Sequence, residues 1–442
     1  MKPSATLISV TLAAALAAPA HADDLLDIYR AAQSQDAVFA AARAAQQAGQ
    51  EKLTQGRSLL LPSVTLTANS TYNNIDTQYM GATVFPSGEK RYNSHGYGVT
   101  LVQPLFREQN WAMYNQSELQ VAISEEQFKA AQQDIILRTA QAYFDVLIAQ
   151  DTVQLTAAQK DAIAQQLEQA KRNFEVGTAT ITDTYEAQAR YDLILAQELA
   201  AANNLEVKRR DLQQLINADV PALNVLGGAF KLVSPEPADA QKWVETAQHN
   251  NVQVRMAEAA YQLAEEEVAR NRGGHLPTVD LVANYSKNTS NGSSFGVGSD
   301  VRSTSVGVQL NMPLFQGGAT QSKWREADAN REKARQDLEN ARRSVAVQTQ
   351  QAYLGVVTGI AQVQALEQAL KSSESLLSAS KLGQEVGVRT SLDVLNAQQQ
   401  MYATRRDLYQ AKYNYLVSQL RLKAAAGSLE EGDLAQVNQA LH

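Results

Sequence analysis

The sequence is written twice. Four motifs of its first half recur in its second half, in the same order. The recurring pairs are Leu61-Pro62-Ser63 with Leu276-Pro277-Thr278, Pro104-Leu105-Phe106 with Pro313-Leu314-Phe315, Gln141-Ala142-Tyr143 with Gln351-Ala352-Tyr353, and Val176-Gly177 with Val386-Gly387. Their spacings are 215, 209, 210 and 210 residues, and the drift lies between the upstream motifs, where a loop absorbs insertions at little cost. Such self-similarity predicts two copies of one structural unit.

A short export signal precedes the duplicated part. It consists of a lysine next to the initial methionine, an apolar stretch over residues 7–18, and the small-x-small motif Ala20-His21-Ala22. The apolar stretch is shorter than the roughly 20 residues that span a bilayer, which argues against a membrane anchor. We therefore assign residues 1–22 to a signal peptide, residues 23–233 to the first repeat, and residues 234–442 to the second repeat.

Each repeat opens with two segments in which apolar and polar residues alternate. In the first, Val64, Leu66 and Ala68 alternate with serine and threonine. Runs of about ten alternating residues are typical of strands in an outer-membrane barrel with a polar lumen, but a soluble sandwich with one buried face gives the same pattern. We expect strands over residues 62–72, 96–106, 277–286 and 303–313, with a long polar loop over residues 288–299.

Long helical hairpins follow the strand pairs. No proline interrupts residues 107–173, and apolar residues recur there at helical spacings. Gly177 and Gly387 mark the turns, because glycine adopts the left-handed conformation that ends a helix, and we expect Thr182 and Ser391 to cap the helices that follow. The expected segments are an N-terminal helix, a hairpin over residues 107–218, helices over residues 237–272, a hairpin over residues 318–426, and a C-terminal segment.

Composition removes several classes of function. The chain has no cysteine and only five scattered histidines, so we expect no metal site and no cofactor. A net charge of −7 provides no basic excess for binding nucleic acid. No GxSxG, HExxH or phosphate-loop motif occurs. We therefore predict no catalytic residues and no enzymatic activity.

Four strands are too few for a membrane barrel. The smallest such barrels have about eight strands, and an open sheet edge is not tolerated in lipid. Beyond the signal, no apolar stretch is long enough for a membrane helix. A chain of this kind that spans a membrane must share its barrel with other copies, and two, three or four copies all satisfy this requirement.

Four segments resemble TolC-like outer membrane efflux proteins, and the resemblance extends over essentially the whole mature chain. They are residues 174–177, 179–183, 386–397 and 411–416, which read FEVG, ATITD, VGVRTSLDVLNA and AKYNYL. The resemblance implies a homotrimer with a 12-stranded outer-membrane β-barrel, continued by a periplasmic α-helical barrel. It implies an exit duct for tripartite efflux or type I secretion, with a periplasmic adaptor and an inner-membrane transporter of the ABC or RND type as partners. The adaptor would dock at the hairpin tips, at Val176, Gly177, Val386 and Gly387.

The same resemblance implies rings of acidic residues at the periplasmic entrance. Asp393 matches the first ring, and Asn396 stands at the second, where the familiar pattern has another aspartate. Carboxylates that converge on a pore axis attract cations and repel anions. The alternative is that Asp393 is an ordinary residue at a helix N-terminus, where the helix dipole favours a negative charge.

The resemblance further implies a polar lock between the hairpins. Arg389 matches the gate arginine, and Thr182 and Asp183 match its hydrogen-bonding partners on the neighbouring hairpin. Gln384 stands where the familiar pattern has a tyrosine, so we expect a lock that is weaker or differently connected. Arg389 as an ordinary solvated side chain is the alternative.

A periplasmic coiled-coil adaptor or scaffold is the main rival function. It would also carry an export signal and long helices, but it would not need amphipathic strands ahead of each hairpin. Within the channel interpretation, proteins, small-molecule drugs or both are compatible as cargo, because no residue pattern in the sequence distinguishes them.

Overall fold

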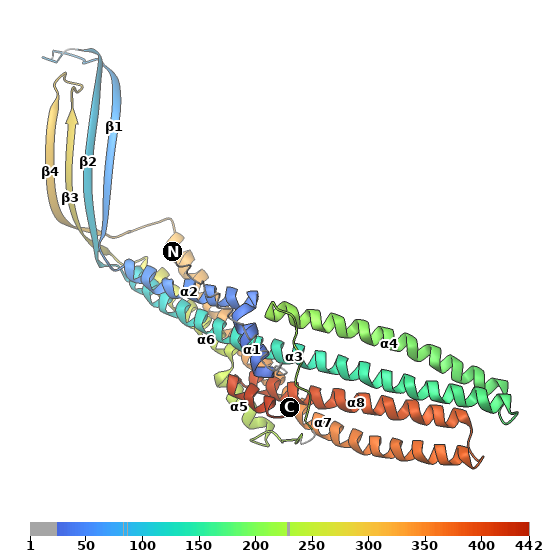
Figure 1. Ribbon diagram of the computed structural model, residues 1–442. Coiled ribbons are helices and arrows are strands. Elements are labelled where there is room, and N and C mark those ends of the chain that lie inside the picture. The colour runs from blue at the N-terminus through green and yellow to red at the C-terminus, as the bar shows by residue number, and fades with distance from the viewer. Residues whose placement is uncertain (1–23, 83, 86, 228–229, 442) are drawn as a thin grey trace, which may run out of the picture.

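The chain is mainly helical, with one antiparallel sheet at one end, as the sequence predicts (Figure 1). The computed structural model describes residues 24–82, 84–85, 87–227 and 230–441, so the expected signal peptide lies outside the described residues. Within these ranges, no helix combines the length and the apolar character needed to cross a membrane.

The two strand pairs join into one four-stranded sheet in the order β1-β2-β3-β4. All neighbours are antiparallel, and β2 of the first repeat pairs directly with β3 of the second. The strands are β1 (Ser63–Thr77), β2 (Gly88–Phe106), β3 (Thr278–Ser290) and β4 (Ser299–Asn311). Both repeats therefore contribute equally to the sheet, and β1 and β4 form its outer edges.

The strands are longer at their loop ends than expected. β1 continues to Thr77 rather than residue 72, and β2 begins at Gly88 rather than residue 96. The loop expected over residues 288–299 is present but shorter, covering residues 291–298, because β3 reaches Ser290 and β4 already begins at Ser299. These ends are polar, and the start of β2 carries the charged residues Glu89, Lys90 and Arg91. Side-chain polarity does not prevent the backbone from forming ladder hydrogen bonds. At its other end, β4 stops at Asn311, two residues before the expected residue 313.

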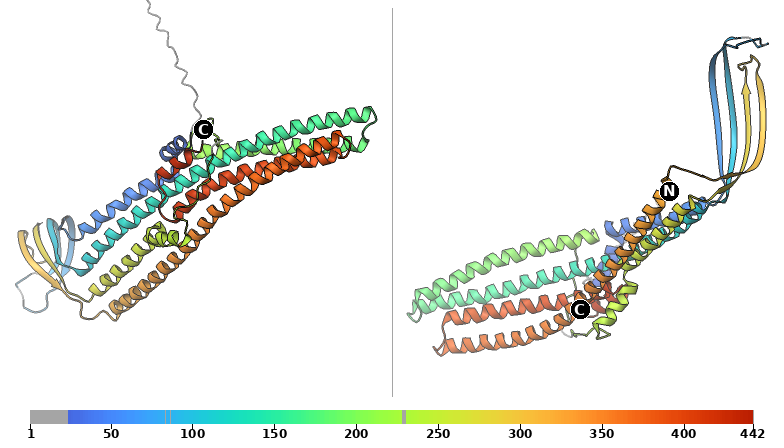
Figure 2. Two further views of the ribbon diagram at one scale, coloured as in Figure 1. Left: turned by 90° about the horizontal axis from the view of Figure 1, so that it is seen from below. Right: turned by 180° about the vertical axis from the view of Figure 1, so that it is seen from behind.

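Two very long helices run away from the sheet, and each turns back at the far end (Figure 2). These are α3 (Glu108–Glu175) with α4 (Ile181–Ile216), and α7 (Ala319–Glu385) with α8 (Ser391–Ala425). At 1.5 Å per residue, the 68 residues of α3 extend about 100 Å. The remaining helices are α1 (Leu25–Gln35), α2 (Ala37–Ser58), α5 (Ala240–Asn250), α6 (Val252–Gly273) and α9 (Glu431–Asn438).

The N-terminal segment, expected as one helix, is two. Asp36 follows the last residue of α1 and is the N-cap of α2, where its carboxylate accepts a hydrogen bond from the backbone N–H of Phe39. Asn251 separates α5 from α6 in the same way, by accepting from the N–H of Gln253. Because both side chains cap a new helix, the chain changes direction at these two residues.

The main hydrophobic core lies where the short helices surround the long ones, midway along the molecule. Phe144 of α3 packs against the rings of Tyr143 and Tyr413, with ring centroids 5.7 Å from each. The hydroxyl of Tyr413 on α8 donates a hydrogen bond of 2.8 Å to the Asp151 carboxylate on α3. This core joins the two hairpins, because α3 belongs to the first repeat and α8 to the second.

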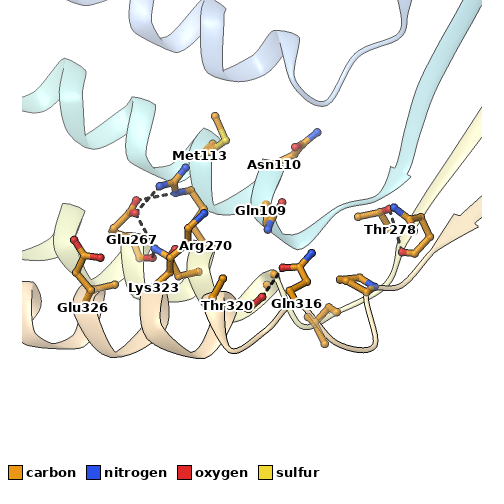
Figure 3. Close-up of a pocket in the computed structure, with 18 of the residues that line it drawn as sticks. Gln109, Asn110, Met113, Glu267, Arg270, Thr278, Gln316, Thr320, Lys323 and Glu326 are labelled. Carbon is orange, nitrogen blue, oxygen red and sulfur yellow. Dashed lines mark hydrogen bonds and ion pairs between the residues drawn. The ribbon is translucent and has the colours of Figure 1, made fainter.

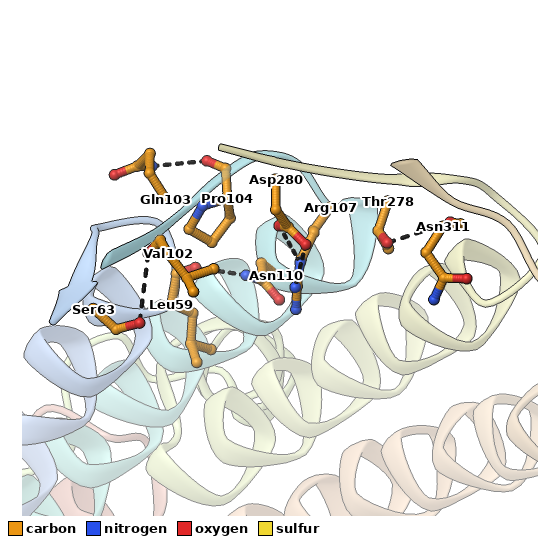
Figure 4. Close-up of polar contacts among 10 residues, drawn as sticks. All are labelled: Leu59, Ser63, Val102, Gln103, Pro104, Arg107, Asn110, Thr278, Asp280 and Asn311. Carbon is orange, nitrogen blue, oxygen red and sulfur yellow. Dashed lines mark hydrogen bonds and ion pairs between the residues drawn. The ribbon is translucent and has the colours of Figure 1, made fainter. Parts of the chain in front are cut away.

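An ion pair fixes the place where the sheet becomes helix (Figure 4). Arg107, the residue before α3, donates through Nε and Nη2 to the two carboxylate oxygens of Asp280 on β3, at 2.8 Å and 2.6 Å. The Asp280 side chain is only 10% exposed. Nearby, Gln103 donates to the carbonyl of Leu60 at 2.9 Å. A two-pronged arginine–carboxylate contact restricts orientation as well as distance, so this pair sets the angle at which the first repeat leaves the sheet.

Replacing Arg107 with methionine should lower the thermal midpoint of the detergent-solubilised protein. The change leaves the nearly buried Asp280 carboxylate without its two donors, and because the Arg107 side chain is itself 37% exposed we expect a loss of about 1 kcal/mol. Arg107→Lys keeps the charge but loses the two-pronged geometry, so its thermal midpoint should lie between those of the native protein and Arg107→Met. Circular dichroism during heating measures the midpoint, and an unchanged value for Arg107→Met would contradict a structural role for the pair.

Candidate functional site at the hairpin tips

The two hairpin tips have the same local construction. In each, a long helix ends and a glycine follows two residues later, Gly177 with a φ of 77° and Gly387 with a φ of 80°. This confirms the expected left-handed turns, which residues with a Cβ adopt only with strain. Val176 and Val386, beside these glycines, are 73% and 65% exposed. Each tip therefore presents an apolar side chain to its surroundings.

The caps of the returning helices lie before the expected residues, by two positions in the first repeat and by one in the second. Thr180 and Thr390 are the N-caps, and the predictions of Thr182 and Ser391 were wrong. The Thr180 hydroxyl accepts from the N–H of Asp183 at 3.3 Å, while the Asp183 carboxylate accepts from the N–H of Thr180 at 2.9 Å. This reciprocal arrangement satisfies two backbone donors that would otherwise lack partners.

Asp393 has the same capping role on α8, where its carboxylate accepts from the N–H of Thr390 at 2.9 Å. The backbone and side-chain hydrogen bonds from Thr390, followed by the charge of Arg389, lower the pKa of Asp393. Arg389 Nη1 lies 3.8 Å from Asp393 Oδ1, and both side chains are exposed enough for this contact to contribute little to stability. Asp393 therefore combines a local structural role with a carboxylate that stays ionised at neutral pH.

A cavity of about 270 Å³ separates the two tips. Asp183 of the first repeat lines it together with Gln384, Gly387 and Arg389 of the second. Thr182, Asp393 and Asn396 lie outside this lining. The structure therefore places four of the expected site residues around one space, although Asp183 is about 200 positions from the other three in the sequence.

Gly383 leaves room for the Arg389 side chain to lie against α7. A Cβ atom on Gly383 would be 2.6 Å from the Cγ of Arg389. Any side chain larger than hydrogen at this position would therefore push the arginine away from α7. Sequence reasoning missed Gly383, since a glycine inside a helix has no recognisable signal of its own beyond its low helix propensity.

Asn396 is held by a contact that sequence reasoning missed. Arg190 of α4 donates from Nη2 to the Asn396 side-chain oxygen at 2.9 Å, and from Nη1 to the side-chain oxygen of Gln399. This links the returning helix of the first repeat to that of the second. The duplication gives no indication of it, because the position that matches Arg190 at a spacing of 210 is Gln400.

The chain matches a protein-family model in two segments. The model for outer membrane efflux protein matches residues 28–218 and 243–428, one segment in each repeat. The chain is 34% identical over 431 residues to outer membrane protein TolC of Escherichia coli, covering 95% of this chain and 85% of the relative. It is 33% identical over 420 residues to the alkaline protease secretion protein AprF of Pseudomonas aeruginosa, covering 95% and 87%.

Solved structures of outer-membrane channels share the fold. The Campylobacter jejuni CmeC outer membrane channel superposes with a TM-score of 0.80 at 16% identity, covering 95% of this chain and 90% of that one. The outer membrane protein VceC of Vibrio cholerae superposes with a TM-score of 0.77 at 19% identity, covering 91% and 96%. The chain is an outer-membrane protein with this fold, and it belongs to the outer membrane efflux protein family.

Proposed function

We propose that three copies of this chain form an exit duct from the periplasm to the exterior of a Gram-negative cell. The duct serves a tripartite efflux or type I secretion system. An inner-membrane transporter of the ABC or RND type supplies the energy, and a periplasmic adaptor joins that transporter to the hairpin tips. The chain itself performs no chemistry and needs no cofactor.

One observation carries the proposal: a four-stranded sheet with an exposed apolar face stands at the end of helices about 100 Å long. Five apolar side chains on one face of β1 and β4 are between 65% and 71% exposed: Val64, Leu66, Val306, Val308 and Leu310. Such a face needs lipid or protein against it. Three copies supply 12 strands, enough for a barrel with a polar lumen.

The periplasmic entrance of the duct lies at the hairpin tips. Asp183, Gln384 and Arg389 line one cavity between the tips, which supports a polar lock between hairpins. Asp393 remains ionised, which supports a ring of three carboxylates on the axis of the trimer. The exposed Val176 and Val386 support docking of an adaptor at the tips, because isolated apolar side chains at a protruding turn offer a partner surface to bury.

Outer-membrane extraction and conductance test the proposal together. The protein should leave outer-membrane fractions only with detergent, and the purified protein should form ion-conducting channels in planar lipid bilayers. Val308→Lys, which places a charge on the apolar face, should reduce assembly in the membrane, whereas Gln309→Lys on the opposite face of β4 should assemble normally. Extraction without detergent, combined with no conductance, would instead favour a periplasmic adaptor.

A gene deletion then identifies the cargo. Loss of specific secreted proteins assigns the duct to type I secretion, and a gain in drug sensitivity assigns it to efflux. The protease-secretion name of the Pseudomonas aeruginosa relative supports the first, while the family description supports the second.

A further inference from the structure

The outer edges of the sheet differ from its interior in a way that suggests a missing neighbour. β2, which has a strand on each side, continues to Phe106, whereas β4, which has one neighbour, stops at Asn311. The duplication matches Phe106 to Phe315, four residues beyond the end of β4. Phe315 is 88% exposed and Phe106 only 41%. An additional strand beside β4 would allow its ladder to continue to the matching position.

The spacings between the repeats also relate the strand pairing of one repeat to that of the other. In the first β-hairpin, formed by β1 and β2, Ser63 pairs with Val102. Ser63 corresponds to Thr278 at the spacing of 215, and Val102 corresponds to Asn311 at the spacing of 209. Thr278 and Asn311 are paired in the second hairpin. The two spacings therefore convert a strand pairing in one repeat into its counterpart in the other, residue by residue.

The pairing of β2 with β3 is then a template for the next seam around a closed barrel. Its counterpart pairs β4 of one chain with β1 of another copy. Leu101 and Ala283 face each other across β2 and β3. At the spacing of 209, Leu101 corresponds to Leu310. At the spacing of 215, Ala283 corresponds to Ala68.

We propose that β4 pairs antiparallel with β1 of a second copy of this chain, with Leu310 opposite Ala68 of the partner subunit. The same register places Val308 opposite the partner's Ser70 and Val306 opposite the partner's Tyr72. The proposal rests on the trimeric duct proposed above and names the residues that form its seam.

Side-chain faces support this register. Leu310, Val308 and Val306 lie on the apolar face of β4, and the matching positions of β1 lie on the same face as Val64 and Leu66. A slip of one residue would place every apolar side chain of one strand beside the polar face of the other. Slips of two residues preserve the faces, so these are the alternatives that an experiment must exclude.

The seam between subunits lacks the ion pair found inside the chain. Arg107 corresponds to Gln316, and Asp280 corresponds to Thr65, by the same two spacings. Gln316 lines an open cavity of about 590 Å³ at the base of the sheet, where its side-chain oxygen accepts from the Thr320 hydroxyl at 2.6 Å (Figure 3). At the boundary between subunits, a neutral glutamine beside the partner's Thr65 therefore takes the place of the Arg107–Asp280 ion pair.

Cysteine cross-linking tests the register, since the chain contains no cysteine of its own. Ala68→Cys with Leu310→Cys should give disulfide-linked dimers and trimers on non-reducing gels of outer membranes. Directly opposite residues lie within the Cα separation of about 4.4–6.8 Å that disulfides require, and diagonal neighbours lie about 7–8 Å apart. Leu66→Cys with Leu310→Cys and Ser70→Cys with Leu310→Cys are the shifted controls. Leu101→Cys with Ala283→Cys should close within one chain and give no linked oligomer.

Each outcome has one interpretation. Faster cross-linking of the 68–310 pair than of both shifted pairs supports the register. Faster cross-linking of a shifted pair, or a 68–310 link confined to the monomer, overturns it. Light scattering of the native protein in detergent separates the two proposals: a trimer that cross-links at the wrong pair contradicts only the register, whereas absence of a trimer contradicts the duct.

Building an arginine–aspartate ion pair at the boundary between subunits gives a second test. Thr65→Asp with Gln316→Arg should raise the temperature at which trimers dissociate in SDS, while either single change should not. A double variant no more heat-resistant than the single variants would overturn the placement of Gln316 beside the partner's Thr65.

Discussion

We expect Asn396→Asp combined with Arg190→Gln to lower the concentration of a trivalent cation that half-blocks the channel by roughly 30-fold relative to Arg190→Gln alone. In the proposed trimer, the change adds three carboxylates beside the ring of Asp393. In water, a trivalent cation about 8 Å from a carboxylate gains about 1.5 kcal/mol, which salt at 0.1 M reduces to about 0.7 kcal/mol. Three such contacts give about 2 kcal/mol.

The second substitution is needed because of the contact between helices α4 and α8. Arg190 donates a 2.9 Å hydrogen bond to Asn396, so an aspartate there would pair with the Arg190 guanidinium and lose much of its attraction for cations. The Asn396→Asp channel should therefore be blocked less strongly than the double variant, which lacks the Arg190 charge. Current recordings in planar bilayers with a trivalent hexammine cation measure the half-blocking concentration of each channel. Equal block of the single and double variants would show that Arg190 does not neutralise position 396.

The large elements of the fold were predictable because they depend on repeated patterns. The spacing of about 210 residues predicted two similar units, and uninterrupted helical periodicity predicted α3 and α7. Alternation of apolar and polar residues predicted all four strands. These signals extend over many residues, so one exception does not change the prediction.

The details that sequence reasoning missed depend on a few atoms each. Serine or threonine at several positions after Gly177 can cap a helix, and only the backbone geometry selects Thr180 over Thr182. The polar ends of β1 and β2 lack alternation, although their backbones pair. The contacts of Arg190 with Asn396 and of Arg107 with Asp280 join residues 206 and 173 positions apart. No local pattern specifies such pairs.

The candidate site was predictable only in part. The resemblance selected Asp183, Gln384 and Arg389, which line one cavity. It gave no indication that Asp183 and Asp393 each bond back to the N-cap threonine of their helix, so each carboxylate has a structural role beside the proposed one. Experiments on the entrance must separate these roles, and the substitutions below are chosen for that purpose.

We expect Arg389→Ala and Asp183→Asn each to raise single-channel conductance several-fold in planar bilayers, because each removes one charge from the cavity between the tips. Asparagine is preferred to alanine at position 183 because its side-chain oxygen can still accept from the N–H of Thr180, which is 2.9 Å from the native carboxylate. The turn is thereby kept while the charge is removed. Arg389→Lys, which retains the charge, should conduct nearly as the native channel does.

Two matched variants separate a lock from a general loosening of the tips. Arg172→Ala removes an arginine from the last turn of α3, outside the lining of the cavity, and should leave conductance unchanged. Thr180→Val removes the cap at a cost of about 1 kcal/mol but leaves the Asp183 charge in place. If Thr180→Val conducts as strongly as Asp183→Asn, the cap rather than the charge holds the entrance closed. If Arg389→Ala conducts no more than the native channel, Arg389 is an ordinary solvated arginine and the entrance is held by other contacts.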